Sequence, residues 1–600
     1  MVAAINDRLK APGNTLHWIA PVERGAGENA TSFETLVEDM HGGHVDTLVM
    51  LDTNPLYAAA AHLQFGAALK RVAESVCLSI LPNETGSASR WAMPMRHPWE
   101  DWSDIRGHEG SAAIQQPLAA PLFAGASPHE IVESLWLADP SSSMELVRST
   151  WASLDEARWQ ESLARGVVEG SAAPSESISF REAAPPDGRA AGGGLALLCR
   201  PDPHVWDGRF ANNPWLQELP RPLSKLTWDN PLLISPALAA AKRLKNGEQV
   251  RLAVGAVSVV APVWILPGQA DATIVALLGF GRRVGEVAAN AGWNFFPLMG
   301  GTGEVTLDKV AGSTALASTE HHSLLVEDAH DIVRHGLLAQ FARDPHFLAP
   351  RGEAAEIYRR RPPGPAAWAM SIDLNACIGC NACSVACQSE NNIPTVGKEA
   401  VLAQREMHWL RIDRYFEGTV DAPQVHFQPM LCMHCEQAPC ETVCPVGATV
   451  HDAEGLNVMV YNRCIGTRFC SNNCPYKVRR FNYFPFAQQE RRAPESRNPD
   501  VTVRARGVME KCTFCIQRIA TARADADRDN RPVGEVRTAC QEACPTQAIT
   551  FGNLADPGSE VAERKQSALS YALLAEQNTH PRVTYEARIR NPNPALEGGS

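Results

Sequence analysis

The apolar positions in the first 200 residues alternate between short runs and longer amphipathic stretches. Residues 31–76 alternate between strand and helix patterns, in which residues 45–51 predict a buried strand and residues 52–55 predict the turn that closes it. Residues 128–166 predict a helical region, and residues 170–194, rich in Gly, Ala, Ser and Pro, predict a linker or long loop. The tryptophans expected in the core of the helical region are Trp136, Trp151 and Trp159.

A different pattern occupies residues 214–299. Short apolar runs at residues 232–234, 250–254 and 257–265 are separated by Gly or Pro turns, which is typical of a β-barrel. The best candidate for a membrane span, residues 254–280, is broken by prolines, a glycine and an aspartate, whereas a membrane helix needs about 18 continuous apolar residues. We therefore expect no transmembrane helix.

Composition narrows the class of protein. The chain has 600 residues, of which 45% are hydrophobic and 20% charged, as in ordinary globular proteins. Its length predicts roughly two to four domains. The formal net charge of −12 argues against nucleic acid as a partner, because phosphate recognition needs a basic surface. The first ten residues lack the basic and apolar segments of a secretory signal, so no signal peptide is expected.

The positions of the cysteines carry the strongest signal. Of 17 cysteines, only Cys77 and Cys199 precede residue 370, and both are expected to be buried apolar residues rather than metal ligands. The other fifteen form four groups. These groups are Cys377, Cys380, Cys383 and Cys387; Cys432, Cys435, Cys440 and Cys444; Cys464, Cys470 and Cys474; and Cys512, Cys515, Cys540 and Cys544.

The spacing within these groups predicts iron–sulfur clusters. The first group has the two, two and three residue spacing of bacterial ferredoxins, and the other three end in Cys-Pro. Closely spaced cysteines on a tight loop can bind three irons of one cluster, whereas the last cysteine points away and ligates the other cluster of a pair. If the cysteines formed disulfides, their repeated spacing would be a coincidence. Structural zinc sites would not explain the last cysteine of each group. His434 is expected to lie at the surface or to support the site without binding metal.

Thr467 stands where the two, two and three spacing would place a cysteine in the third group. A hydroxyl is a poor replacement for a thiolate on iron. The expected outcome is the loss of one corner and a [3Fe-4S] cluster. The alternative is a [4Fe-4S] cluster with a water or hydroxyl ligand.

Several stretches resemble known families. Residues 231–250, 266–268, 279–281 and 290–294 resemble the C-terminal β-barrel domain of molybdopterin oxidoreductases. The cysteine-rich part is similar to the four-cluster electron-transfer subunits of that superfamily. The order of these parts resembles the iron–sulfur (B) subunit of alternative complex III, in which a molybdopterin-oxidoreductase-like module without cofactor precedes the cluster-binding part. Further stretches that carry this resemblance are residues 83–85, 116–118, 464–482 and 591–594.

This resemblance implies a fold and a set of cluster ligands. The implied fold is an α/β plus β-barrel module followed by an α+β double ferredoxin-like domain. The implied divisions are residues 1–195 for a partial α/β region without cofactor, 196–345 for the β-barrel and 346–600 for four clusters. Motif pairing also comes from the resemblance, since spacing alone does not say which motif meets which. The implied [4Fe-4S] ligand sets are Cys377, Cys380, Cys383 and Cys544; Cys387, Cys512, Cys515 and Cys540; and Cys432, Cys435, Cys440 and Cys474; the implied [3Fe-4S] ligands are Cys444, Cys464 and Cys470.

The resemblance also implies a role in electron transfer within a membrane-associated, quinol-oxidising respiratory complex. Electrons from quinol would pass through one [3Fe-4S] and three [4Fe-4S] clusters towards cytochrome c-type subunits, with no substrate-transforming site on this chain. The implied partners are a polytopic quinol-binding membrane subunit and multihaem and monohaem cytochrome c subunits, at the periplasmic face of the bacterial inner membrane. Family members carry a longer N-terminal region, so either a separate chain supplies it or the gene start is shortened. No molybdenum is expected.

Other interpretations stay open. The chain could be the electron-transfer subunit of a molybdopterin-dependent reductase or dehydrogenase, and its N-terminal module could be a non-catalytic assembly scaffold. The basic run at residues 477–480 is interpreted either as a docking site for the membrane subunit or as a solvated surface with structural ion pairs.

Overall fold

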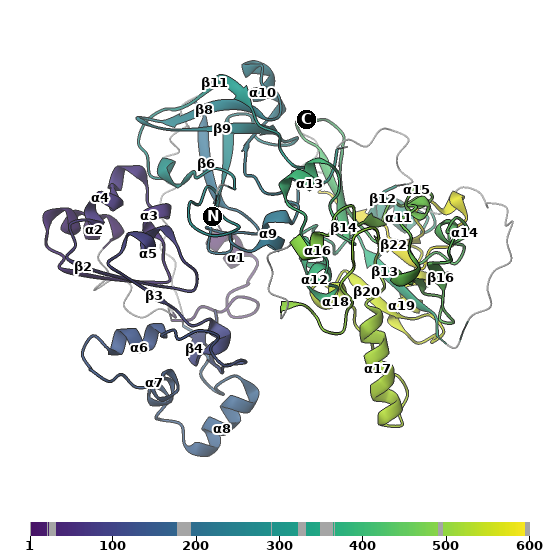
Figure 1. Ribbon diagram of the computed structural model, residues 1–600, viewed down its shortest axis with the longest axis horizontal. Helices are drawn as coiled ribbons and strands as arrows, with labels where there is room; N and C mark the ends of the chain where they lie inside the picture. The colour runs from purple at the N-terminus through teal and green to yellow at the C-terminus, as the bar shows by residue number, and fades with distance from the viewer. Residues whose placement is uncertain are drawn as a thin grey trace.

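The computed structural model describes residues 2–20, 22, 32–176, 194–289, 291–321, 332–347, 364, 366–489 and 496–593. The chain runs from a purple N-terminal lobe through a teal β-sheet region to a green and yellow C-terminal lobe (Figure 1). Most of the linker predicted at residues 170–194 lies outside the described residues.

A small parallel sheet organises the N-terminal lobe. Its strands are β1 (Thr47–Leu51), β2 (Glu74–Ser79) and β3 (Trp91–Pro94), in that order. The helices α2 (Phe33–Gly42) and α4 (Phe65–Leu69) bury apolar side chains against β1 and β2. The strand predicted at residues 45–51 is confirmed as β1.

Three short helices and a hairpin form a second part of this lobe. The helices are α6 (Pro128–Glu133), α7 (Ser143–Thr150) and α8 (Glu156–Arg165), and the hairpin joins β4 (Ser103–Arg106) to β5 (Ala112–Gln115). Trp159 is buried and Trp151 packs partly buried against the same core, as predicted. The prediction is wrong for Trp136, which is 67% exposed because α6 ends before it.

The middle of the chain forms a mixed sheet of six strands in the order β11-β8-β9-β7-β10-β6. The strands are β6 (Ala196–Pro201), β7 (Leu232–Ile234), β8 (Glu248–Val254), β9 (Val257–Ile265), β10 (Thr273–Leu278) and β11 (Val305–Ser313). Alternate residues of β8 and β10 are buried in one apolar core, as the period of a strand requires. One isolated bridge pairs Leu195, which directly precedes β6, with Val305, the first residue of β11, and so links the two edge strands. A closed β-barrel stays a prediction.

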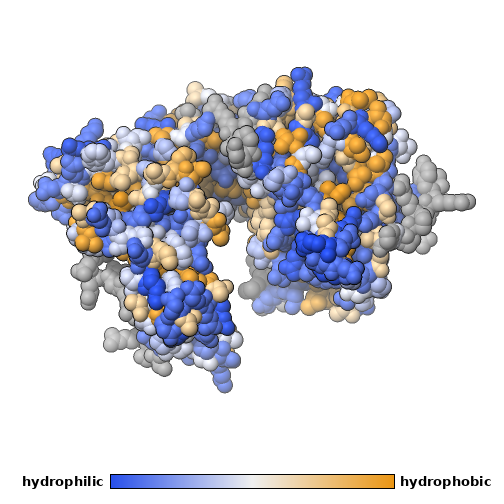
Figure 2. Space-filling model, turned by 60° about the horizontal axis from the view of Figure 1, so that its bottom comes forward, coloured by the Kyte–Doolittle hydropathy of each residue, from blue (hydrophilic) through white to orange (hydrophobic). Residues whose placement is uncertain are grey.

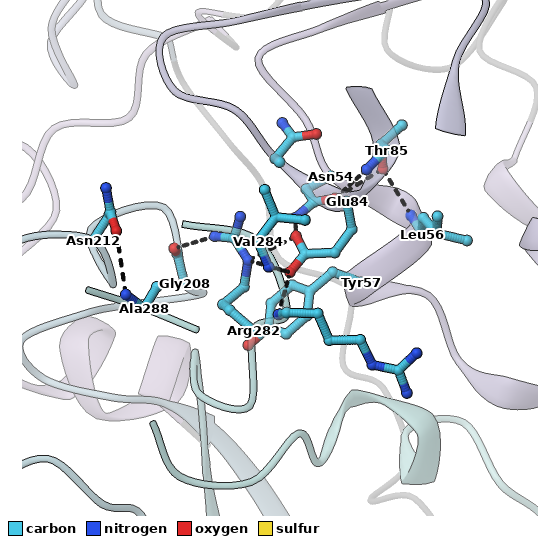
Figure 3. A network of polar contacts seen from close by, with 12 residues as sticks. Asn54, Leu56, Tyr57, Glu84, Thr85, Gly208, Asn212, Arg282, Val284 and Ala288 are labelled. Atoms are coloured by element: carbon cyan, nitrogen blue, oxygen red, sulfur yellow. Dashed lines mark hydrogen bonds and ion pairs between the residues drawn. The ribbon is translucent and has the colours of Figure 1, made fainter. Parts of the chain in front are cut away.

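A buried ion pair connects the N-terminal lobe to this sheet (Figure 3). Glu84, the first residue of α5 (Glu84–Ala88), accepts hydrogen bonds of 2.8 and 3.0 Å from Nε of Arg282. The same carboxylate accepts the backbone N–H groups of Arg283 at 2.7 Å and Val284 at 3.1 Å. Tyr57 donates its hydroxyl to the carbonyl oxygen of Phe280 at 2.7 Å. These contacts fix the lobe on the loop that follows β10.

The C-terminal lobe is built around a four-stranded sheet in the order β20-β13-β22-β21. Its strands are β13 (Trp368–Asp373), β20 (Ile549–Asn553), β21 (Ser570–Tyr571) and β22 (Val583–Glu586), and beside it lies the hairpin of β14 (Arg411–Glu417) and β15 (Gln424–Met430). The apolar core of this lobe includes six of the clustered cysteines, so the cysteine loops are packed into the core. They are Cys383, Cys387, Cys432, Cys474, Cys512 and Cys540.

Buried polar contacts join the six-stranded sheet region to the C-terminal lobe. Glu218, the last residue of α9 (Pro214–Glu218), accepts the backbone N–H groups of Val396 and Gly397 at 2.7–3.0 Å. The amide of Asn381 donates to the carbonyl oxygen of Pro220 at 2.7 Å. Because Asn381 directly follows Cys380, this interface reaches the first cysteine loop.

Among the described residues, no helix is both long and apolar enough to cross a membrane. Polar and apolar residues are interspersed on the face shown in Figure 2, and a recess separates its left and right lobes.

Candidate functional site

The first cysteine loop and the last cysteine meet in one cavity. Cys377, Cys380, Cys383 and Cys544 all line it, together with apolar side chains of β13 and β14. Asn381 adopts a left-handed conformation (φ 65°) just before α12 (Ala382–Glu390), so the loop turns directly into the helix that carries Cys383. Gly379 has φ 70°, and a Cβ there would lie 2.5 Å from the ring of Phe427. The loop is therefore tightly specified.

A second group of cysteines lies one helical turn further along α12. Cys387 is fully surrounded by protein, and burial, followed by the nearby sulfurs of Cys512, Cys515 and Cys540, raises its pKa. The side-chain amide of Asn391 contacts both Cys387 Sγ, at 3.6 Å, and Cys515 Sγ, at 4.0 Å. Cys515 immediately precedes α17 (Ile516–Arg528), and Cys540 lies in α18 (Ala539–Glu542). One helix thus supplies cysteines to two different groups.

The third group lines a separate cavity. It consists of Cys432, Cys435, Cys440 and Cys474, and Tyr476 and Arg479 line the same cavity. Cys440 lies in the short helix α14 (Pro439–Thr442).

The fourth group has three cysteines and a threonine. Cys444, Cys464, Cys470 and Thr467 line one cavity, and Cys470 lies in α15 (Phe469–Asn472). Thr467 therefore occupies the position in space, as well as in sequence, at which the first loop has a cysteine. The fifteen cysteines thus lie in four clusters of side chains, and which of them bind which iron–sulfur cluster stays a prediction.

Two of the three cysteines that precede a proline, Cys444 and Cys544, are held in the same way. The backbone N–H of Ala448 donates to Cys444 Sγ at 3.2 Å, and that of Ala548 donates to Cys544 Sγ at 3.2 Å. Each donor lies four residues after its cysteine. Such N–H groups favour a charged sulfur, and hydrogen bonds to sulfur are among the features that set the potential of an iron–sulfur cluster. The repeat indicates two equivalent halves.

The buried thiols are costly to ionise when no cation is near. Burial raises the pKa of Cys377 to about 11, that of Cys440 to about 11 and that of Cys515 to about 12, so the protein alone disfavours their thiolates. None of the seventeen cysteines, all of which are described, forms a disulfide. Iron binds thiolates and would therefore stabilise the ionised form of these converging sulfurs, which is unfavourable without a cation. The residues present therefore fit iron–sulfur clusters.

Arg479 lies between the third and fourth groups, and it is only 5% exposed. Its Nη2 donates to Cys440 Sγ at 2.9 Å, to Thr449 Oγ1 at 2.8 Å and to Asn457 Oδ1 at 2.9 Å. Arg480 instead pairs with Glu406 at 2.7 Å. The docking interpretation of residues 477–480 is wrong for both arginines, because their guanidinium groups bind to residues of the same lobe.

His434 is fully buried, so a surface role for it is wrong. Its Nδ1 accepts the backbone N–H of Asn457 at 3.1 Å, which leaves Nε2 to donate to the carbonyl oxygen of Cys512 at 3.1 Å. The ring stacks on Phe514 with centroids 3.9 Å apart. Burial lowers the pKa of His434 well below its usual value, so the ring is neutral. It supports the loops of the second and third groups.

Sequence reasoning missed Arg479 and Asn457 as parts of the site. Asn457 accepts a hydrogen bond from Arg479 through its side-chain oxygen and donates its backbone N–H to His434. Because His434 in turn donates to the carbonyl oxygen of Cys512, Asn457 connects the third group to the loop of Cys512. Nothing in the sequence around residue 457 indicates this role. Only the fold brings β17 (Asn457–Met459) next to these loops.

A large cavity of about 1070 Å³ lies apart from the cysteines, where the N-terminal lobe, the sheet region and the C-terminal lobe meet. Asp52, Arg209, Trp215, Trp228 and Phe486 are among its lining residues. Neither Cys77 nor Cys199 lines it. Cys77 is buried as predicted, whereas Cys199 is partly exposed, because it lies on the edge strand β6.

These four groups, with their sulfur-directed N–H donors and apolar surroundings, define an iron–sulfur protein with ferredoxin-like cluster loops. Two models of the 4Fe-4S dicluster domain match the chain, at residues 376–448 and 423–486. The chain is 41% identical over 228 residues to the iron–sulfur cluster-binding subunit of menaquinone reductase from Nitratidesulfovibrio vulgaris, a match that covers 37% of this chain and 89% of that protein. The chain belongs to this family of iron–sulfur subunits of reductase and oxidoreductase complexes.

Other relatives carry related names. Iron–sulfur subunit 1 of the Hdr-like menaquinol oxidoreductase from Archaeoglobus fulgidus is 34% identical, over 36% of this chain and 82% of that protein. The iron–sulfur subunit ArrB of arsenate respiratory reductase from Shewanella sp. is 33% identical, over 36% of this chain and 94% of that protein. Among solved structures, acetylene hydratase from Pelobacter acetylenicus matches 42% of this chain and 40% of its own with a TM-score of 0.31 and 15% identity, which is too weak to assign a fold.

Proposed function

We propose that this chain is the electron-transfer subunit of a membrane-associated, quinol-oxidising respiratory complex of the alternative complex III type. The observation that carries the proposal is the convergence of fifteen cysteines into three groups of four and one group of three beside Thr467. Each iron–sulfur cluster carries one electron at a time, and several clusters in one lobe can pass electrons from one cluster to the next.

The proposed ligands are the four groups as they lie in space. Three groups of four cysteines each hold a [4Fe-4S] cluster, and Cys444, Cys464 and Cys470 hold a [3Fe-4S] cluster. The relatives that are named for menaquinone or menaquinol support quinol as the electron source. Partners are a polytopic quinol-binding membrane subunit and cytochrome c-type subunits, with the chain at the periplasmic face and no molybdenum of its own.

We further propose residues 1–195, 196–345 and 346–600 as the domains, the second of them a closed β-barrel. The first two serve as a scaffold. The buried contacts of Glu84 with Arg282 and of Glu218 with Val396 support this role, because they tie all three parts into one body.

The test is purification of the complex from native membranes, followed by identification of its subunits and its metals. The proposal expects near fifteen irons per chain, a three-iron electron paramagnetic resonance signal in the oxidised protein, and cytochrome c and polytopic subunits in the complex. About eight irons per chain, or the absence of the three-iron signal, would contradict the cluster assignment.

A second candidate function is the electron-transfer subunit of a molybdopterin-dependent reductase. It is favoured by the similarity to the iron–sulfur subunit of arsenate respiratory reductase. The same purification separates the two proposals. A molybdenum-containing catalytic subunit in place of the cytochromes would support the reductase and refute the alternative complex III type.

A further inference from the structure

Three potential metal ligands converge away from the cysteines, where two pairs of strands meet. His335 is the first residue of β12 (His335–Leu337), Glu417 is the last residue of β14, and His426 lies in β15. Glu417 Oε2 lies 3.1 Å from Nε2 of His335 and 2.9 Å from Nε2 of His426. One ligand atom from each residue can be chosen so that all lie within 4.8 Å of one another.

The β-structure positions these side chains before any ion binds. His426 pairs with Tyr415 across the hairpin, and Glu417 lies two residues further along that strand, so Glu417 and His426 share one face as diagonal neighbours. β12 pairs with β23 (Arg588–Arg590), where His335 is opposite Arg588. Arg588 also donates to the carbonyl oxygen of Val425 at 2.7 Å, which holds β23 against the hairpin. The histidines thus approach Glu417 from two separate strand pairs.

The distances match the coordination shell of a small divalent ion. Zinc bound at about 2.0–2.1 Å in a tetrahedral site separates its ligand atoms by about 3.3 Å. The observed 2.9 and 3.1 Å are within a few tenths of an ångström of that value. The two imidazoles lie side by side, stacked with centroids 4.5 Å apart and planes at 24°, and both Nε2 atoms contact Glu417 Oε2.

The surroundings suit neutral imidazole ligands. The side chain of His426 is 1% exposed and that of His335 is 14% exposed, whereas Glu417 is 25% exposed. A metal ion binds neutral imidazole and ionised carboxylate, and two histidines with one carboxylate supply three of the four ligands of a tetrahedral site.

We propose that His335, Glu417 and His426 bind one divalent transition-metal ion, with zinc as the ion that fits best, as a clamp between β12 and the β14–β15 hairpin. The loop of this hairpin reaches the six-stranded sheet region, because the backbone N–H of Gly268 donates to the carbonyl oxygen of Val420 at 2.9 Å. The ion stiffens the seam between the cluster-bearing lobe and the sheet region. It takes no part in electron transfer.

The test uses the full chain with its iron–sulfur clusters loaded, dialysed against zinc chloride and then against zinc-free buffer. The expected result is one retained zinc per chain. Zinc-edge X-ray absorption is expected to show only nitrogen and oxygen neighbours near 2.0 Å, without the sulfur shell near 2.3 Å that zinc in a vacant cysteine site would give. Zinc is also expected to raise the midpoint of thermal unfolding.

Substitutions assign the site. In His426→Gln and in His335→Gln, retained zinc is expected to fall at least fivefold while the iron content stays unchanged. The matched control is His44→Gln, because His44 pairs with Asp39 at 3.5 Å on the exposed surface, and its zinc retention is expected to equal that of the wild type. The proposal is overturned if the wild-type chain retains no zinc, if the zinc has sulfur neighbours, or if both variants retain it. The first of these outcomes would mean that the three residues form a hydrogen-bonded triad only.

Discussion

Replacing Arg479 tests whether a single buried cation sets the potential of the clusters beside it. Its Nη2 lies 2.9 Å from Cys440 Sγ, and the side chain is almost fully buried. Removing the positive charge disfavours the reduced form of a neighbouring cluster, because reduction adds a negative charge. The potential of the cluster bound by Cys440 is therefore expected to fall in Arg479→Gln.

The contact between Arg479 and Cys440 Sγ allows an order-of-magnitude value for this effect. With the guanidinium at about 6 Å from the cluster centre and an effective dielectric constant of about 20, the interaction with one added electron is about 3 kcal/mol. For a one-electron couple this corresponds to about 120 mV, and water entering the vacated space reduces the effect, so a fall of about 50–120 mV is expected.

The assay is a redox titration of the full chain followed by electron paramagnetic resonance, after iron analysis has shown that the clusters are retained. Arg479→Lys keeps the charge and is expected to shift the potential much less. Lys477→Gln removes an exposed cation two residues away and is expected to have an effect near zero, because water and salt screen it. Unchanged potentials in an Arg479→Gln variant with full iron content would refute the electrostatic reasoning.

Three further predictions test other parts of the molecule. Thr467→Cys is expected to convert the three-iron cluster to a [4Fe-4S] cluster, lower its potential and abolish the three-iron signal of the oxidised protein. Burial lowers the pKa of His408 to about 4, so its folded form binds fewer protons than the unfolded chain and stability falls as the pH drops below about 6.5. Relative to pH 7.5, this one residue is expected to cost about 2 kcal/mol at pH 5, and calorimetry should show a weaker pH dependence in His408→Gln but not in exposed His108→Gln. Glu84→Gln is expected to destabilise the chain by about 3–5 kcal/mol in denaturant titrations, because it leaves Arg282 buried without its charge partner. Asp207→Asn, at a partly exposed pair with Arg209, should cost at most about 1 kcal/mol.

The sequence predicted the cluster chemistry better than the surroundings of the clusters. Cysteine spacing is a local property, so the loops around Cys377 and Cys432 can be recognised without any tertiary information. The pairing of Cys377 with Cys544 needed a family resemblance, because no local pattern joins residues so far apart.

The polar partners of the clusters could not be predicted in the same way. Arg479 has the same side chain as Arg480, and only the fold decides that one faces Cys440 and the other Glu406. The six-stranded sheet shows a similar limit. Its apolar runs were recognised from the sequence. The strand order β11-β8-β9-β7-β10-β6, however, depends on parallel pairs such as β7 with β9, and the alternation of apolar and polar residues along a strand does not reveal which strands pair.

The convergence of Cys377 with Cys544 in one cavity has a consequence for biosynthesis. The ribosome must release the chain beyond Cys544 before the outer groups can close, whereas the two inner groups have all their sulfurs once Cys474 has emerged. Under the proposed ligand sets, the two inner groups can therefore be complete before the two outer groups are. α12 carries Cys383 and Cys387, which the proposed ligand sets assign to the two outer groups. A chain that terminates before Cys540 would therefore lack a ligand of each outer cluster.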